Sequence, residues 1–306
     1  MTPLEPAVAI RSRSIRSWPR LLSGIRFDEV CALQGTPLIG AVLSIGALSM
    51  NSMLEAALVV AGNVCLIAHV FLFNDWSGID GDLNDPNRAA RTFAAKGLSR
   101  TDVGYLSISL LAIGLLLFAT VGATPFLIGL AIAGLSALYS APAFHLKGKP
   151  LFSSALHLCG GALHFLLGYA AFRAIDARGL LISLFFALVF TAGHFTHEAR
   201  DHEGDTVNGI RTNAVAFGKT RSFVAGLALF TAAYGLLVAL AISGLVPRVL
   251  MLAAILYPLH LAASLRALRA GLTFESLVSL QRCYRALCAI IGVATVMATL
   301  ASLSGS

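Results

Sequence analysis

The sequence predicts an all-α polytopic membrane protein with nine transmembrane helices, and two observations carry that prediction. Of 306 residues, 57% are hydrophobic and only 12% are charged, whereas roughly a quarter of the residues in a typical soluble domain are charged. The chain also contains long runs without any charged residue, and about 20 apolar residues are enough to cross the hydrocarbon core of a bilayer. These runs are continuous rather than alternating, which favours helices over a transmembrane β-barrel.

Eight uncharged runs define the expected spans in chain order. They comprise residues 30–54, 56–74, 103–146, 150–172, 179–197, 222–247, 249–265 and 286–306. The third run is about twice as long as one span requires. Because Gly122, Thr124 and Pro125 lie in its middle, where glycine and proline interrupt a helix, this run is expected to form two helices. The expected count is therefore nine.

The positions of the basic residues predict the orientation. If the N-terminus is cytoplasmic, 19 of the 22 Lys and Arg residues lie on the cytoplasmic side, and only Arg173, Arg178 and Arg248 lie on the other. Because Lys and Arg are retained in cytoplasmic loops, we expect a multi-pass protein of the cytoplasmic (inner) membrane with its N-terminus inside. Residues 1–28 then form a basic cytoplasmic arm, and residues 29–306 form a single transmembrane domain. The net charge of +7 reflects the basic cytoplasmic face, so no nucleic-acid partner is expected.

Eight of the fifteen acidic residues gather in two short segments, one after the second expected span and one after the sixth. They are Asp75, Asp80, Asp82 and Asp85, and then Glu198, Asp201, Glu203 and Asp205. In the second segment three acids stand at i, i+3 and i+7, and in the first Asp75, Gly78 and Asp82 have the same offsets. Each set therefore lies on one face if the helix of the span continues through it.

The two acidic segments also suggest an internal repeat. They lie about 123 residues apart, and an Asn and an Arg follow each of them at similar distances. A fixed offset of this kind predicts two four-helix pseudo-repeats, at about residues 29–146 and 150–267, with a ninth helix appended.

Two carboxylate clusters that face each other would bind hard divalent cations. Mg²⁺ takes carboxylate oxygens and leaves room for substrate phosphates, whereas a transition metal more often recruits His or Cys. The pair His197-Glu198 begins like a zinc-binding HExxH motif, but the second histidine, His202, is one residue too far along, so zinc is not expected. A magnesium–diphosphate complex is the favoured ligand.

At this point the sequence resembles the UbiA-type intramembrane prenyltransferases. The stretch from Asn74 to Asp82 is similar to the first family signature, NDxxDxxxD, and the stretch from His197 to Asp205 is similar to the second, DxxDxxxD. The two motifs stand in the family's order and at the expected helix ends.

A third similarity and one departure complete the comparison. The segment Tyr139-Ser140-Ala141-Pro142, followed by Lys147, is similar to the tyrosine, proline and basic residue after the fourth helix of the family. The first motif departs from the family pattern at its middle acid, where this chain has Gly78. The resemblance therefore covers nearly the whole chain but puts the metal coordination at the first motif in question.

The resemblance implies a UbiA-like fold and a function. Its members ionise an allylic isoprenoid diphosphate with Mg²⁺ and transfer the prenyl group to an acceptor, often a small aromatic molecule and sometimes a lipid. The implied metal ligands are Asp75, Asp80, Asp82, Glu198, Asp201 and Asp205. The implied catalytic residues are Tyr139 and three cations that stabilise the leaving diphosphate, Arg88, Lys147 and Arg211. The implied substrate-binding residues are Arg26, Asn74, His197 and Asn208.

Two alternatives stay open. A UbiA-type terpene cyclase would ionise the same diphosphate and fold the cation back on itself, and the motifs do not separate it from a transferase. A transporter also suits nine helices with an internal repeat, but parallel repeats and acids at the cytoplasmic ends of the spans favour an interfacial enzyme site. The acceptor, the length of the prenyl chain and the oligomeric state are left open by the sequence.

Overall fold

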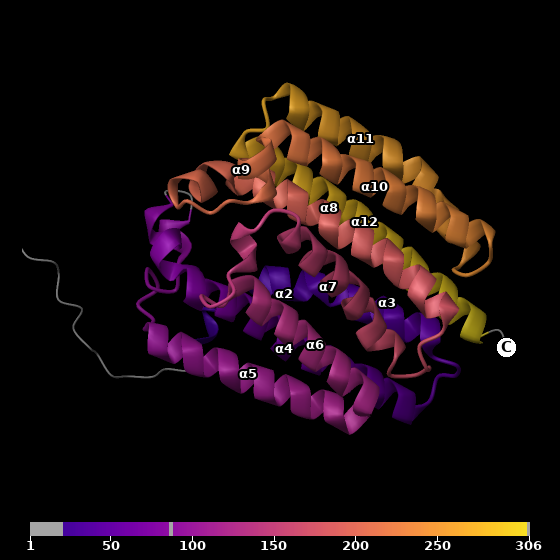
Figure 1. The fold of residues 1–306 in the computed structure, drawn as a ribbon. Helices are drawn as coiled ribbons and strands as arrows, with labels where there is room; N and C mark the ends of the chain where they lie inside the picture. Colours follow the sequence, from indigo (N-terminus) through magenta and orange to yellow (C-terminus); the bar gives the residue numbers. More distant parts are fainter. Residues whose placement is uncertain (1–20, 86–87, 305–306) are drawn as a thin grey trace, which may run out of the picture.

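The computed structural model describes residues 21–85 and 88–304, and in these ranges all regular structure is helical (Figure 1). The α-helices are α2 (Phe27–Leu33), α3 (Gly35–Ser44), α4 (Met50–Asn84), α5 (Arg100–Val121), α6 (Ala123–Ser140), α7 (Phe152–Tyr169), α8 (Ala177–Val207), α9 (Asn213–Phe217), α10 (Lys219–Ile242), α11 (Ala253–Arg269) and α12 (Phe274–Ser304). Three short 3₁₀ helices join them: η1 (Ala89–Arg91), η2 (Leu146–Gly148) and η3 (Arg248–Leu252). Most of the predicted N-terminal arm, residues 1–28, lies outside the described residues.

Seven helices in the described part of the chain are long and apolar enough to cross a membrane, so the predicted count of nine is not confirmed. They are α4, α5, α6, α8, α10, α11 with η3, and α12. The segment from 152 to 169 is helical as expected, but α7 carries two histidines and two serines, which lower its apolar content. The predicted break at Gly122 separates α5 from α6.

The expected first span, residues 30–54, is not one helix. It is divided among α2, α3 and the beginning of α4, with a non-helical segment at 45–49. The reason is local: the Ser49 side chain accepts a hydrogen bond from the Ser52 backbone N–H, and the Ser52 hydroxyl accepts one from Ser49. This capping box starts a new helix at Met50, six residues before the predicted start of the second span.

Helices α4 and α8 continue through the acidic segments, as required for the acids of each segment to share one helix face. They contain 35 and 31 residues. A helix of 35 residues is about 50 Å long, against about 30 Å for the hydrocarbon core. The C-terminal turns of α4 and α8 therefore extend beyond the apolar layer and carry the acids there.

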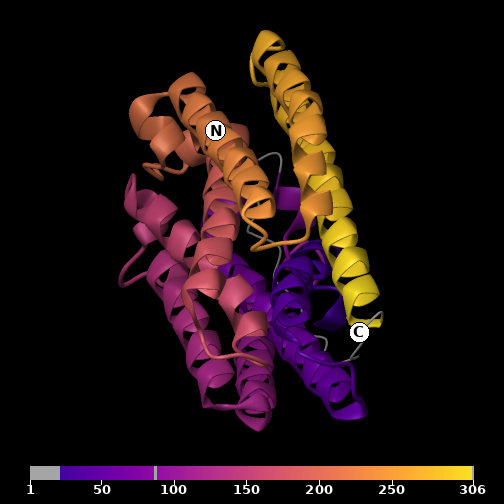
Figure 2. The same cartoon turned by 90° about the vertical axis from the view of Figure 1, so that its right-hand side faces the viewer.

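Close helix packing brings the two halves of the chain together. Helix α3 lies against α7, where a Cβ added to Gly40 would overlap the Phe165 carbonyl and one added to Gly168 would overlap the Pro37 carbonyl. Small residues permit this backbone approach inside a membrane. Figure 2 shows α11 and α12 side by side along one flank, the arrangement that their mutual contacts describe.

Both predicted pseudo-repeats have the same order of elements. A long helix (α4 or α8) is followed by a short helical segment (η1 or α9) and then by another long helix (α5 or α10). This order agrees with the internal repeat, whose boundaries stay a prediction, as does the orientation of the chain across the membrane.

Candidate functional site

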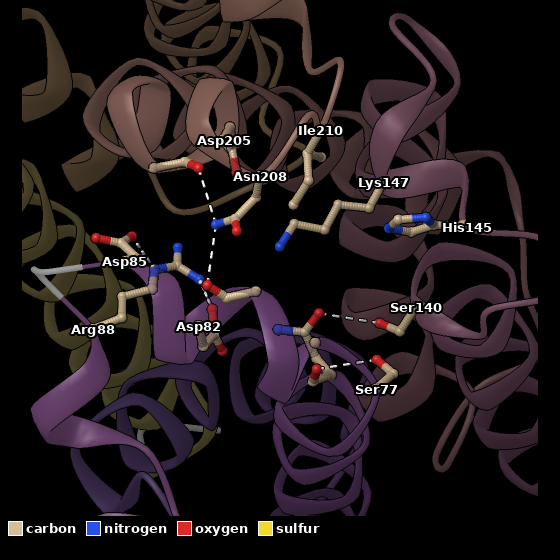
Figure 3. Close-up of a pocket in the computed structure, with 14 residues that line it drawn as sticks. Ser77, Asp82, Asp85, Arg88, Ser140, His145, Lys147, Asp205, Asn208 and Ile210 are labelled. Atoms are coloured by element: carbon tan, nitrogen blue, oxygen red, sulfur yellow. Dashed lines mark hydrogen bonds and ion pairs between the residues drawn. The ribbon is translucent and has the colours of Figure 1, made fainter. Parts of the chain in front are cut away.

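A polar pocket lies where the ends of α4, α6 and α8 meet (Figure 3). It is lined by Asn74, Ser77, Gly78, Gly81, Asp82, Asp85, Arg88, Ser140, His145, Lys147, Gly204, Asp205, Asn208 and Ile210. Six of these are residues that the sequence singled out for the site: Asn74, Asp82, Arg88, Lys147, Asp205 and Asn208. The pocket thus joins residues from the first motif, the second motif and the segment after α6.

Arg88 links the two acidic motifs. Its guanidinium lies 3.1 Å from Asp82 Oδ1 and 3.6 Å from Asp85 Oδ2, and its Nη2 also pairs with Asp201 Oδ2 of α8. Burial works against the charge of Arg88, but Asp201 and Asp82 outweigh it, so the pKa of Arg88 is raised above its ordinary value. This side chain therefore stays protonated and joins Asp82 of the first motif to Asp201 of the second.

Lys147 supplies a second cation from the opposite wall. It lies in η2, after the turn at His145, which has the left-handed backbone conformation with φ 44°. Figure 3 shows its amine directed into the pocket. Its charge attracts the carboxylate of Asp205, but among the described residues no hydrogen bond or ion pair within 4.0 Å occupies the ammonium group, so it can also bind an anion in the pocket.

Two asparagines fix the walls of the pocket. Ser140 Oγ donates to Asn74 Oδ1 over 3.2 Å, which ties α6 to α4. Asn208 Nδ2 donates to the Gly81 carbonyl over 3.1 Å and to the Gly204 carbonyl over 3.0 Å, which ties the end of α8 to α4. Both side chains thereby hold helices in register around the space they line.

Eight predicted site residues do not line the pocket, and Arg26, Asp75, Asp80 and Arg211 are four of them. Asp75 is paired with Arg26, whose Nε lies 3.1 Å from Asp75 Oδ2. Asp80 is 83% exposed and lies 3.5 Å from Arg100, because the continuing helix turns it away from Asp82. Arg211 is exposed and does not line the pocket.

Tyr139 precedes the pocket residue Ser140 and packs beside the pocket. Its ring centroid lies 5.2 Å from that of His157 and 6.4 Å from that of His194. The two histidine rings stack on each other with centroids 3.8 Å apart. An aromatic cluster therefore borders the inner side of the polar site, between α6, α7 and α8.

Glu198 is buried in a hydrogen-bond network rather than exposed in the pocket. Its carboxylate accepts from the Asn213 backbone N–H at 3.1 Å and from Asn213 Nδ2 at 2.9 Å and 3.1 Å. Ser153 Oγ donates to it over 3.2 Å, and His194 Nε2 lies 3.0 Å away. Asn213 Oδ1 in turn accepts from the Leu151 backbone N–H. Glu198 thus fastens α8 to the starts of α7 and α9.

Two further residues of the second motif face other partners. Asp201 is bound by Arg200, at 2.7 Å and 2.9 Å, as well as by Arg88, and Arg200 also donates to Gln281 of α12. His197 is half-buried, and its Nε2 has no hydrogen-bond partner among the described residues. Of the acids of the second motif, only Asp205 therefore lines the pocket.

Sequence reasoning missed Asn213 and the pocket residues Ser77 and His145. Ser77 lies inside the first motif and donates to the Asn74 carbonyl at 3.0 Å. A signal for Asn213 was present, because it directly follows the glycine and small polar residues that trail the second motif. His145 carried no pattern that would have distinguished it.

No group of three His, Cys, Asp or Glu side chains within the described ranges is close enough to hold a metal ion. The pocket nevertheless presents three carboxylates, those of Asp82, Asp85 and Asp205, with amide oxygens beside them. Mg²⁺ is usually held by only one or two carboxylates, with phosphate oxygens and water completing its shell. The donors present therefore fit Mg²⁺ bound together with a phosphate ligand, and do not fit a closed metal cage.

Comparisons with known proteins concern the whole chain and its fold. The profile of the UbiA prenyltransferase family matches residues 36–273. The fold is similar to a UbiA homologue from Archaeoglobus fulgidus bound to GPP and Mg²⁺, with TM-score 0.69, 17% identity, and coverage of 91% of this chain and 99% of that one. A structure of digeranylgeranylglyceryl phosphate synthase gives TM-score 0.68 at 20% identity over 93% of this chain and 99% of the other.

A third structure, the apo form of a UbiA homologue from Aeropyrum pernix K1, has TM-score 0.68 and 19% identity over 88% of this chain and 97% of that one. A comparison with curated protein sequences gives no match. At these identities the solved structures establish the fold.

Proposed function

Because the chain belongs to the UbiA prenyltransferase family, we propose that it transfers a prenyl group from an allylic isoprenoid diphosphate to a small aromatic or lipid acceptor, with Mg²⁺ as cofactor. The chain is an integral, multi-pass membrane protein. The observation that carries the proposal is the pocket in which Arg88 and Lys147 face the carboxylates of Asp82, Asp85 and Asp205. Cations and divalent-metal ligands around one space are what a diphosphate requires.

The pocket chemistry suits a leaving diphosphate. In the proposed reaction the bond between C1 of the prenyl group and the bridging oxygen breaks, and the electron pair leaves with the diphosphate. The guanidinium of Arg88 and the ammonium of Lys147 are placed to stabilise this growing negative charge. When bound, Mg²⁺ would be held by Asp82 and Asp205 and would act as a Lewis acid on the phosphate oxygens.

The allyl fragment carries the complementary positive charge. Tyr139, next to Ser140 at the end of α6, is assigned the role of stabilising this cation, since the face of an aromatic ring attracts positive charge. The acceptor then bonds to C1 and loses a proton. Apolar helices around the inner side of the site exclude water, which would otherwise capture the cation.

Known relatives support the donor and the metal. The Archaeoglobus fulgidus homologues are described as bound to GPP and Mg²⁺ and to DMAPP and Mg²⁺. A further relative is named for the synthesis of a glyceryl phosphate lipid, which keeps a lipid among the acceptors for this chain. The excess of Lys and Arg at the end that carries the pocket supports a cytoplasmic site.

The test is a matrix of reactions in membranes that contain the protein. Donors from geranyl to long polyprenyl diphosphates are combined with aromatic and lipid acceptors, with and without Mg²⁺, and products are identified by mass spectrometry. We expect pyrophosphate release and a prenylated acceptor only when Mg²⁺ and acceptor are both present, and chelation should stop both. Pyrophosphate release with a hydrocarbon product and no acceptor would instead identify a cyclase.

A matched pair of variants ties the activity to the pocket. Lys147→Gln removes the free ammonium group and should lower kcat about 100-fold, the usual loss on removing one donor to a developing anion. Lys149→Gln removes an exposed lysine two residues away that does not line the pocket, and should leave kcat within about twofold. Equal loss in both variants would contradict the assigned role of Lys147.

A further inference from the structure

The first acidic motif, from Asn74 to Asp82, presents one of its acids, Asp82, to the pocket, and Arg26 holds another, Asp75, elsewhere. Its guanidinium pairs with both oxygens of Asp75, through Nε at 3.1 Å and through Nη2. A planar guanidinium matches a carboxylate with two parallel hydrogen bonds. Asp75 does not line the pocket. The first acid of the motif is therefore already neutralised by a cation of the chain itself.

Arg26 is held firmly at this position. Glu29 lies 3.7 Å from its Nη1, and its guanidinium lies over the ring of Phe71, 5.8 Å from the centroid. Burial opposes its charge, but Asp75 and Glu29 outweigh that effect and raise the pKa of Arg26. Helix α2, which begins directly after Arg26, packs against α4, which carries Asp75.

The middle position of the motif offers no ligand. Gly78 lines the pocket, and a Cβ built there would have only Asp82 Oδ2 near it, at 4.0 Å. Asp80 does not replace the missing carboxylate, because it is exposed on another face of α4 beside Arg100. Of the two acids at positions i and i+7, Asp75 and Asp82, only Asp82 lines the pocket, and it already contacts Arg88.

A second divalent cation would therefore meet too few ligands. Two facing acidic clusters would ordinarily hold a pair of cations that clamp the reacting phosphate. Here the pocket-lining acids of the first cluster are Asp82 and Asp85, and both already contact Arg88. Asp75 is bound by the guanidinium of Arg26. The positive charge that balances Asp75 is supplied by Arg26.

We propose that this protein binds its diphosphate substrate with a single divalent cation, and that Arg26, paired with Asp75, replaces a second one. This inference rests on the proposed function. It assigns Arg26 a positioning role through Asp75 and makes Gly78 the residue that determines the metal stoichiometry.

The experiment counts bound metal rather than turnover. The full-length protein, purified in detergent without divalent metals, is equilibrated with Mn²⁺ and geranyl thiolodiphosphate, an analogue whose bridging sulfur prevents ionisation. Unbound material is removed, and manganese and phosphorus are measured per chain in the same sample, with electron paramagnetic resonance to detect spin coupling between neighbouring Mn²⁺ ions. We expect one analogue molecule and one uncoupled Mn²⁺ per chain.

Two substitutions should change that count. Gly78→Asp introduces a carboxylate beside Asp82 and should raise the count to two ions with a spin-coupled signal, whereas Gly78→Asn fills the same space without charge and should keep one. Arg26→Gln frees Asp75 and should also raise the count to two, whereas Arg26→Lys keeps the charge and should keep one. Because Gly78 stands in open space, its variants test the proposal even if Arg26→Gln does not fold.

The outcomes separate this inference from the function on which it rests. Two coupled Mn²⁺ ions in the unmodified protein would overturn the single-cation proposal and leave the proposed function standing. One Mn²⁺ in the unmodified protein and in Gly78→Asp would overturn the role assigned to Gly78. Binding of neither Mn²⁺ nor the analogue would overturn the proposed function itself.

Discussion

Replacement of Glu198 distinguishes a buried structural carboxylate from a metal ligand. Four donor atoms are directed at this carboxylate: the Asn213 backbone nitrogen and Nδ2, Ser153 Oγ and His194 Nε2. Glu198→Ala would remove the acceptor that these groups share. Asn213 Nδ2 would keep Ser154 Oγ, but the Asn213 backbone N–H would lose its buried partner. Glu198→Gln would keep one oxygen toward Asn213 and would present an amide to the hydroxyl of Ser153.

The magnitudes follow from this geometry. An unsatisfied buried donor costs about 1–3 kcal/mol, and neighbouring losses are not additive, so Glu198→Ala should destabilise the protein by about 3–5 kcal/mol. Glu198→Gln should cost about 1–2 kcal/mol, because it exchanges charged hydrogen bonds for neutral ones. The larger effect corresponds to a fall in Tm on the order of 10 °C for a chain of this size.

Two measurements separate the hypotheses. The unfolding temperature of each variant is measured in detergent, and the Mg²⁺ dependence of pyrophosphate release is measured well below that temperature. We expect Glu198→Gln to unfold at a moderately lower temperature and to require the same Mg²⁺ concentration for half-maximal rate. An unchanged unfolding temperature together with a tenfold higher Mg²⁺ requirement would refute our reasoning and would make Glu198 a metal ligand.

Two further predictions address the site and the packing. Asp205→Asn should lower kcat/KM at least about 100-fold, because Asp205 is the second-motif carboxylate in the pocket. Asp80→Asn, at an exposed position, should change kcat/KM less than about twofold. Similar losses for both variants in a pyrophosphate-release assay would contradict the placement of these acids. Gly168→Ala should destabilise the protein by about 1–3 kcal/mol, because the new Cβ overlaps the Pro37 carbonyl. The control is Gly160→Ala, where a new Cβ has nothing within 4 Å. Equal unfolding temperatures for the two variants would refute the prediction.

Much of the fold could be predicted because it depends on local properties. Charged residues are rare in the hydrocarbon, so the uncharged runs locate the long helices from α5 onward and the break at Gly122. The last run, 286–306, misses the first twelve residues of α12, which begins at Phe274. The division of residues 30–54 was not predicted, because hydropathy does not register the capping box at Ser49 and Ser52. In the same way α7 was expected to resemble the other spans, although its histidines set it apart.

The candidate site was predicted in part, for a similar reason. Helical periodicity places Asp75, Gly78 and Asp82 on one face of α4 and turns Asp80 away from it, and the structure agrees. Periodicity does not identify the partner of each acid. Glu198 and Asp205 share a face in the sequence pattern, yet one is enclosed by Asn213 and the other borders the pocket.

The sequence by itself determined that this chain crosses a membrane and carries two matched polar segments at helix ends, since composition and periodicity are properties of short stretches. Only the tertiary structure decided which charges meet. Asp75 meets Arg26 from 49 residues away and Asp201 meets Arg88 from 113 residues away, contacts that depend on how α2, α4 and α8 pack. Coulomb attraction at such sites depends on distances of a few ångströms, and those distances exist only after the helices have assembled.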